Sequence, residues 1–133
     1  MTNQITIRRA KQEDASEVLA LASKNFPQSR IEIKDQDLVL VAQEKGRIIG
    51  FIHFCKRKDN LILQAVVVRE DFRGRGIGTK LIEMAMQESG IKDKKILLKV
   101  ESRNIEAINL YQKSGFNLKN FGKNYTLEKK PCN

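Results

Sequence analysis

Residues 72–80 read FRGRGIGTK, so three glycines and two arginines stand directly before an apolar pattern of helical period. A strand that ends in such a loop and opens a helix points several backbone N–H groups at one spot, and the helix dipole adds positive potential there. Glycines also let the backbone approach an anion closely and adopt positive φ angles. Together these features are typical of a site for a pyrophosphate.

Three known phosphate loops differ from this one in spacing or context. Gly74, Gly76 and Gly78 follow GxGxG, and Thr79 stands where the dinucleotide-binding fingerprint has its third glycine. The nucleoside-triphosphate loop ends in GK[ST], whereas this loop ends in GTK. A kinase glycine loop lies between two strands, not ahead of a helix. The pattern that remains is R-x-x-G-x-G at Arg73, Gly76 and Gly78, and the alternative is a glycine-rich helix start with surface arginines.

A second pattern lies in NIEAINLYQKSGF, residues 104–116. The spacing N-x-x-A-x-x-L-Y-x-x-x-G-F is formed by Asn104, Ala107, Leu110, Tyr111, Gly115 and Phe116. In this order, separated by one helix and one strand, the two patterns resemble those of the GNAT superfamily of acyl-CoA-dependent N-acyltransferases, especially its ribosomal-protein alanine acetyltransferase-like branch. The resemblance covers nearly the whole chain and is strongest over residues 61–116.

The resemblance implies an α/β fold whose central sheet is mixed, mostly antiparallel and flanked by helices. This sheet would splay between its fourth and fifth strands, residues 61–68 and 94–102, and acetyl-CoA would lie in the splay as co-substrate. Asn104 would hydrogen-bond the pantetheine arm, and Tyr111 would lie near the thioester sulfur. The pantetheine would pair with the backbone of Val66, Val67 and Val68. The pyrophosphate site would comprise Arg73, Gly74, Arg75, Gly76, Ile77, Gly78 and Thr79.

Acyl transfer to an amine requires a neutral amine, a polarised carbonyl and a thiolate that can leave. A free alkyl amine has a pKa of about 10.4, so a base or a chain of waters must remove its proton at neutral pH. The resemblance implies that a backbone N–H near Val67 or Val68 binds the carbonyl oxygen. It also implies that Tyr111 protonates the departing sulfur as general acid. The alternative for Tyr111 is a partly buried helix tyrosine with a satisfied hydroxyl.

The general base has several candidates. The related alanine acetyltransferases carry a glutamate on the strand before the tyrosine helix, and the matching residue here is Lys99, which cannot act as a base while charged. Glu101 shares a strand face with Lys99 and is the candidate substitute, although it also fits a surface carboxylate at a strand end. His53 titrates in the useful range, but its apolar strand favours a satisfied core or edge histidine. Ordered water is the remaining candidate.

Two short segments bear on the acceptor. Only Gly122–Lys123–Asn124 is available to turn the last hairpin, and residues 24–37, which usually form the other wall, are few. Both features predict an open acceptor cleft and argue against specificity for peptide N-termini. A small amine and a protein N-terminus or lysine stay as alternative acceptors.

The elements that must position these residues alternate in type. Residues 5–10 alternate as a short strand, and Asp14 is placed to begin a helix that Pro27 ends. Residues 37–57 predict two strands around a turn at residues 44–47. The predicted apolar face of the first helix consists of Val18, Leu19, Leu21 and Ala22.

Residues 61–68, LILQAVVV, are apolar on both faces, which predicts a central strand. The helix after the glycine loop is expected to begin near Gly76 and to end at Gly90. Its buried stripe would comprise Ile77, Leu81, Ile82 and Ala85.

A strand at residues 94–102 and a helix at 105–115 follow, and residues 116–118 with 125–128 would form a closing hairpin. This order predicts one mixed α/β domain over residues 1–133.

The composition narrows the class of protein. With 41% hydrophobic residues the chain can bury a core. It contains neither a membrane-spanning apolar run nor a secretory h-region, which favours a cytoplasmic protein. A monomer or a homodimer is expected. The 25 Lys+Arg against 16 Asp+Glu give a net charge of +9, which suits a polyanionic partner or a generally lysine-rich surface. A basic nucleic-acid-binding module is one alternative function, but no matching motif is present. The other alternative function is a non-catalytic acyl-CoA-binding regulator, because Lys99 stands where the related acetyltransferases carry a glutamate.

The two cysteines form no CxxC motif or Cys/His cluster in the sequence, which argues against a zinc site or disulfide framework, and no metal is expected. Cys55 is expected to be a buried small hydrophobe, and Cys132 to be exposed near the C-terminus.

Overall fold

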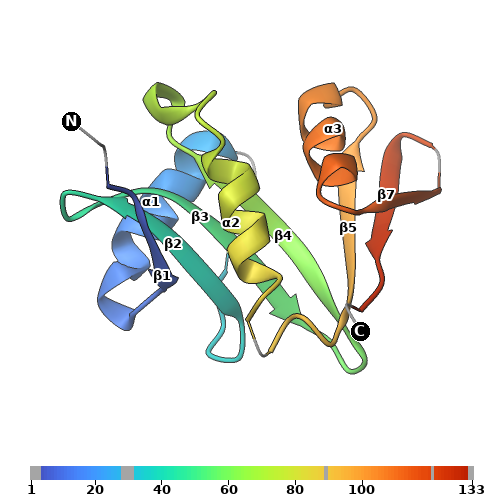
Figure 1. The fold of residues 1–133 in the computed structure, drawn as a ribbon, viewed down its shortest axis with the longest axis horizontal. Helices are drawn as coiled ribbons and strands as arrows, with labels where there is room; N and C mark the ends of the chain where they lie inside the picture. Colours follow the sequence, from blue (N-terminus) through green and yellow to red (C-terminus); the bar gives the residue numbers. More distant parts are fainter. Residues whose placement is uncertain (1–3, 28–31, 89, 121, 132–133) are drawn as a thin grey trace.

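Figure 1 shows the computed structural model, which describes residues 4–27, 32–88, 90–120 and 122–131. Seven strands form one sheet in the order β1-β2-β3-β4-β5-β7-β6. The strands are β1 (Thr6–Arg9), β2 (Leu38–Glu44), β3 (Arg47–Lys56), β4 (Asn60–Val68), β5 (Lys95–Glu101), β6 (Asn117–Asn120) and β7 (Asn124–Lys129). The helices are α1 (Ala15–Asn25), α2 (Ile77–Ala85) and α3 (Ile105–Lys113), with 3-10 turns η1 (Gln12–Asp14) and η2 (Glu70–Phe72).

Every neighbouring pair of strands is antiparallel except β4 and β5, which are parallel. The prediction of a mixed α/β fold with a mostly antiparallel sheet is therefore confirmed, and β4 is the central strand, as its two apolar faces indicated.

The sheet opens between β4 and β5. These strands pair only at their first residues, Asn60 with Lys95, Leu61 with Ile96 and Ile62 with Leu97. Beyond Ile62 the two strands diverge, as Figure 1 shows. The β5-facing edge of residues 63–68 thus has no strand partner within the described part of the chain, which leaves its backbone N–H and C=O groups available to a ligand. This is the splay that the resemblance implied.

Helices cover both faces of the sheet. In the view of Figure 1, α2 and α3 lie on the near side and α1 on the far side. The near face holds the larger core cluster, in which Leu81 and Ile82 of α2 pack with Leu61 and Leu63 of β4. On the far face, Val18 and other residues of α1 pack against the central strands.

One extra residue in β4 decides which side chains face which layer. His53 pairs with Ala65 but Phe54 pairs with Leu63, so Gln64 has no partner on β3 and forms a β-bulge. As a result Leu63 packs in the near-side core, whereas Ala65 and its second neighbour Val67 pack on α1.

The structure corrects three details of the sequence-based prediction. Leu19 is 37% exposed, because it lies on α1 to one side of the stripe that Val18 and Ala22 form. Helix α2 ends at Ala85 and not at Gly90, and the turn that follows brings Ile91 into the core. Cys55 is only half-buried. Cys132 lies outside the described residues, as do residues 28–31 of the predicted acceptor wall.

Asp14 occupies the N-cap position of α1, but its carboxylate does not cap that helix. Its Oδ2 accepts hydrogen bonds from Nη1 of Arg8 at 2.7 Å and from the backbone N–H of Lys11 at 2.6 Å. Nη2 of Arg8 donates to Oδ1 at 3.1 Å, which makes the pair bidentate and ties β1 to the start of α1.

Acid should therefore weaken the fold through Asp14. The hydrogen bond from Arg8 holds the pKa of this carboxyl below its ordinary value, and the Lys11 N–H adds to this against the effect of burial. Because the folded-state pKa is lowered, the stabilisation is present above the unfolded pKa and is lost as pH falls through the folded value. We expect Asp14→Asn to lower the free energy of unfolding by about 1–3 kcal/mol at pH 7 and to reduce its loss between pH 5 and 2. Denaturant titrations at both ends of that range measure it.

Glu13→Gln is the matched control, because Glu13 is exposed and its Oε1 lies 4.0 Å from Nζ of Lys11. It should change the free energy of unfolding by under about 0.5 kcal/mol. An equal acid loss in Asp14→Asn and the parent protein would contradict the assignment.

No helix of the described residues combines the length and the apolar character needed to cross a membrane.

Candidate active site

The glycine loop connects β4 to α2 through η2. Gly74 has a φ of 80° and Gly76, the N-cap residue of α2, has a φ of 77°. Side chains with a Cβ adopt this left-handed region only with strain. A Cβ added at either glycine would meet no atom within 4 Å, so the space beside both is open to a ligand.

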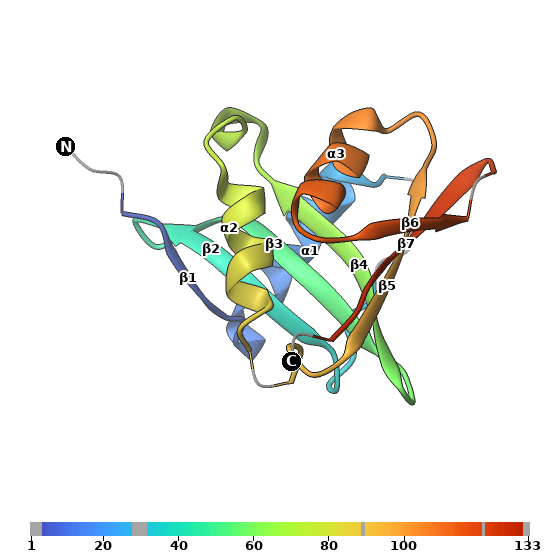
Figure 2. The same ribbon diagram turned by 45° about the vertical axis from the view of Figure 1, so that its right-hand side comes forward.

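A cavity of about 380 Å³ opens where this loop faces α3. β4 supplies one wall with Val66, Val67 and Val68, and the loop supplies the second. The N-cap and the first two turns of α3 supply the third wall with Asn104, Ala107 and Leu110. In Figure 2, α2 and α3 lie side by side with β4 passing between them. The predicted cofactor residues that line this cavity are Val66, Val67, Val68, Arg73, Gly74, Gly76, Ile77, Gly78, Thr79 and Asn104.

Gly78 allows the first turn of α2 to lie close to both other walls. A Cβ added to Gly78 would lie 3.6 Å from Cδ2 of Leu110 and 3.8 Å from Cγ1 of Val66. A side chain at position 78 would therefore occupy space between the three walls that glycine leaves to the cavity.

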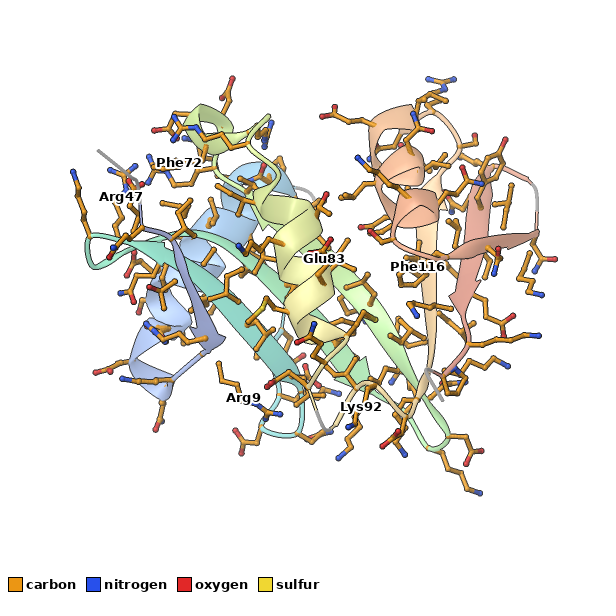
Figure 3. The ribbon with its side chains drawn as sticks, in the orientation of Figure 1. Arg9, Arg47, Phe72, Glu83, Lys92 and Phe116 are labelled. Carbon is orange, nitrogen blue, oxygen red and sulfur yellow. The ribbon has the colours of Figure 1, made fainter. Side chains whose placement is uncertain are left out.

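The two arginines of the loop are engaged with the protein itself. Nε of Arg73 donates to the carbonyl of Val68 at 3.0 Å, and its Nη2 donates to Oδ1 of Asn25 at 2.6 Å. This side chain thus fixes the loop to the last residue of α1. The guanidinium of Arg75 stacks over the ring of Phe72 at 4.8 Å, and Arg75 is not among the residues that line the cavity. Phe72 is labelled in Figure 3, in the turn before the loop.

Asn104 caps α3, because its Oδ1 accepts a hydrogen bond from the N–H of Ala107 at 3.1 Å. This use of the carbonyl leaves the amide N–H₂ group of the side chain to donate toward the cavity that it lines.

Tyr111 lies one helical turn beyond Ala107, on the same side of α3. Its ring meets Phe116 edge-on, with 5.8 Å between centroids, and Phe116 is labelled in Figure 3. Burial raises the pKa of Tyr111 to about 12. No side-chain hydrogen bond of its hydroxyl is found among the described residues. Tyr111 is not itself a lining residue of the cavity.

Glu101 stands apart from this cavity. It is the last residue of β5, lies opposite Asn124 and is exposed. Lys99 is also exposed, while Val100 between them is buried, so the two charged residues share one strand face as expected. The structure does not bring Glu101 to either of the two cavities beside β4.

The second cavity, of about 630 Å³, lies at the α1 side of the sheet and is lined in part by the segment 24–37, which was expected to wall an open acceptor cleft. β4 contributes Gln64 and Ala65 to it, directly before the residues that line the first cavity. Phe26, which follows α1 and is 39% exposed, lines both. The two cavities therefore adjoin along β4. The remaining lining residues of the second cavity are Glu32, Lys34, Gln36, Asp37, His53, Cys55, Lys56 and Arg57.

A buried pair forms the floor of the second cavity. Nε2 of His53 and Oδ2 of Asp37 are 2.8 Å apart, and each side chain is 2% exposed. The backbone N–H of Lys34 also donates to this carboxylate, at 3.0 Å. Burial raises the pKa of Asp37, but the hydrogen bonds from His53 and Lys34 outweigh it and hold the pKa below its ordinary value.

Cys55 borders the same pair. Its Sγ lies 3.7 Å from Oδ2 of Asp37 and accepts a hydrogen bond from Nε2 of Gln64 at 3.1 Å. Burial raises the pKa of the Cys55 thiol. The prediction of a core histidine agrees with the burial of His53, but its partner Asp37 was missed because it precedes β2 and carries no strand signal.

The comparisons with known proteins agree with this geometry. Residues 35–118 match the family model described as "Acetyltransferase (GNAT) domain". An uncharacterized N-acetyltransferase of Methanocaldococcus jannaschii, MJ1207, is 32% identical over 91 residues, which cover 62% of this chain and 40% of that protein. The 5-NmdU N-acetyltransferase of Pseudomonas phage PaMx11 is 29% identical over 125 residues, 84% of this chain and 86% of the phage protein.

Among solved structures, the PaiA N-acetyltransferase of Thermoplasma acidophilum in complex with coenzyme A has the same fold. The TM-score is 0.76 at 21% identity, over 96% of this chain and 99% of that one. The present chain spans well under two thirds of the archaeal relative MJ1207, at 40% of its length.

Proposed function

Because this chain belongs to the GNAT family of acetyltransferases, we propose that it transfers an acetyl group from acetyl-CoA to a primary amine. The observation that carries the proposal is the first cavity. Both sequence motifs, although separated by a helix and a strand, line it together with the free edge of β4. The coenzyme A in the related archaeal structure supports acetyl-CoA as the co-substrate.

In this proposal acetyl-CoA occupies the splay. The pantetheine pairs with the backbone of Val66–Val68, and the open space beside Gly74 and Gly76 takes the pyrophosphate, toward which the first N–H groups of α2 point. The amide of Asn104 donates to the pantetheine.

The acceptor enters from the second cavity, which adjoins the first along β4. The amine nitrogen attacks the thioester carbonyl carbon, so a C–N bond forms, the C–S bond breaks and coenzyme A leaves as a thiolate. A backbone N–H of β4 near Val67 or Val68 stabilises the oxyanion. The hydroxyl of Tyr111 donates to the departing sulfur, and the amine proton passes to solvent.

Two measurements test the function. Acetyl-CoA at 100 times its Kd should stabilise the fold by about 2.7 kcal/mol, seen as a rise in melting temperature. Release of free thiol should then follow addition of an amine from a panel of primary amines. Binding of acetyl-CoA without transfer to any amine would instead indicate the acyl-CoA-binding regulator.

Water, not Glu101, is proposed to carry the amine proton, because Glu101 is exposed at the end of β5 and lines neither cavity. Glu101→Gln should lower kcat by less than about tenfold, well short of the 10²–10⁴-fold effect of a positioned base. Steady-state kinetics from pH 6 to 9 measure this. A loss beyond a thousandfold with acetyl-CoA affinity intact would instead make Glu101 the base.

A further inference from the structure

The acceptor cavity carries an excess of positive charge. Lys34, Lys56 and Arg57 line it, and none of the three forms an ion pair within the part of the chain that the structure describes. Some cations elsewhere in the described residues are paired, such as Arg9 with Glu88 at 2.6 Å and Lys95 with Glu128 at 3.0 Å.

The carboxylates of the cavity do not offset this charge. Asp37 is 2% exposed, and its Oδ2 already binds His53 and the N–H of Lys34, so it offers little to a ligand. Glu32 is the one exposed carboxylate among the lining residues. Three cations thus face a single exposed anion.

Lys99 lies across the splay on β5, where Glu101 on the same strand face offsets its charge. Its neighbours on β5, Leu98 and Val100, belong to the core on the α2 side, so Lys99 projects from the opposite face. The bulge at Gln64 places Ala65 on that same face, where it lines the acceptor cavity.

The positively charged side chains that line the acceptor cavity repel a simple alkylammonium ion. Like charges at about 4 Å repel by about 1 kcal/mol even in bulk water, and more where water is excluded. The same side chains favour the neutral, reactive form of an amine and attract an anion attached to it. Lysine supplies compact charges and arginine a planar fork of donors, a set that suits the several oxygens of a phosphate.

We propose that the acceptor is a primary amine borne on a phosphate-containing molecule, whose phosphate binds Lys34, Lys56 and Arg57 while the amine reaches β4. This rests on the proposed function. Phe26 stands where the two cavities meet and offers its exposed ring to the part of the acceptor between the amine and the phosphate.

Matched amines with and without phosphate test the proposal. O-phosphoethanolamine and ethanolamine form the small pair. An oligodeoxynucleotide with an aminoalkyl group on one base, compared with the free aminoalkyl nucleoside, forms the other. We expect kcat/KM to be more than about tenfold higher for the phosphate-bearing member of at least one pair, and to fall as salt is raised. Which pair responds distinguishes a small phosphate ester from a nucleic acid.

The variant Lys56→Glu/Arg57→Glu should bring that ratio to about one or below, with the melting temperature and acetyl-CoA affinity unchanged. Lys58→Glu is the matched control, because Lys58 is exposed beside the same hairpin turn but does not line the cavity. It should keep the ratio of the parent protein.

Equal kcat/KM within both pairs would overturn the proposal, even if acetyl transfer itself is robust. If no amine is acetylated, the proposed function is wrong. The proposed phosphate site is then tested by ligand binding alone. Calorimetric titration of O-phosphoethanolamine and of the amino-oligonucleotide into the protein with coenzyme A should then show binding that Lys56→Glu/Arg57→Glu removes. Absence of binding by both probes would overturn the inference.

Discussion

Tyr111→Phe lowers the maximal rate of acetyl transfer by roughly 10²-fold or more, while the melting temperature and the affinity for acetyl-CoA stay nearly unchanged. Phenylalanine keeps the ring and its edge-on contact with Phe116. It removes only the hydroxyl, which has no hydrogen-bond partner among the described residues and which we propose donates to sulfur. Steady-state kinetics with saturating acetyl-CoA measure the effect.

The raised pKa of Tyr111, about 12, refines its role. The phenol stays protonated across the physiological range, and full transfer of its proton to a thiolate with a pKa near 8.5 is uphill. Tyr111 is thus expected to stabilise the thiolate by a strong hydrogen bond, and the rate should show no decline from tyrosine ionisation below about pH 10.

An acyl donor with a more acidic thiol provides the control, because its sulfur needs less help to leave. The deficit of Tyr111→Phe should shrink with such a donor. Equal rates for Tyr111→Phe and the parent protein on acetyl-CoA would remove Tyr111 from the mechanism.

Gly76→Glu weakens coenzyme A binding by more than about tenfold, equivalent to about 1.4 kcal/mol. The substitution adds bulk and negative charge in the open space where the pyrophosphate is proposed to lie. It also forces a side chain into a φ of 77°, which itself costs about 1–2 kcal/mol of stability. Calorimetric titration with coenzyme A separates affinity from stability.

Gly76→Ala is the matched variant, since it introduces the same backbone strain without the charge and its Cβ meets no atom within 4 Å. It should melt at about the same temperature as Gly76→Glu and keep most of the affinity for coenzyme A. If both variants bind coenzyme A as the parent protein does, the glycine loop is not a phosphate site.

The sequence predicted the parts of the site that depend on local backbone physics. The glycine loop was recognised because a left-handed turn before a helix requires glycine, as the φ angles of Gly74 and Gly76 confirm. The central position of β4 followed from its two apolar faces. Leu19 was misplaced because it lies next to the buried stripe of α1, and spacing alone does not fix the edge of such a stripe.

Features that depend on distant pairing could not be predicted in this way. The buried carboxylate of Asp37 is paired with the imidazole of His53 on β3. The guanidinium of Arg73 is oriented by its hydrogen bond to Asn25 of α1. Neither contact leaves a periodic signal. The segment 24–37 was expected to wall the acceptor cleft, but the other lining residues of this cavity were missed for the same reason, since they come from separate segments of the chain.

The bulge gives β4 one residue, Gln64, whose loss would not change the faces of the other side chains. Removing Gln64 would restore regular alternation and would leave Leu61, Leu63, Val66 and Val68 on the face that they now share. The hairpin tip at residues 57–59 lies outside β3 and β4. A change of length there leaves the alternation of side chains along both strands unaffected. Insertions and deletions that reshape the acceptor side of this protein are therefore expected at Gln64 or at the hairpin tip, and a homologue aligned with a gap elsewhere in β4 should be realigned before its residues are compared with these.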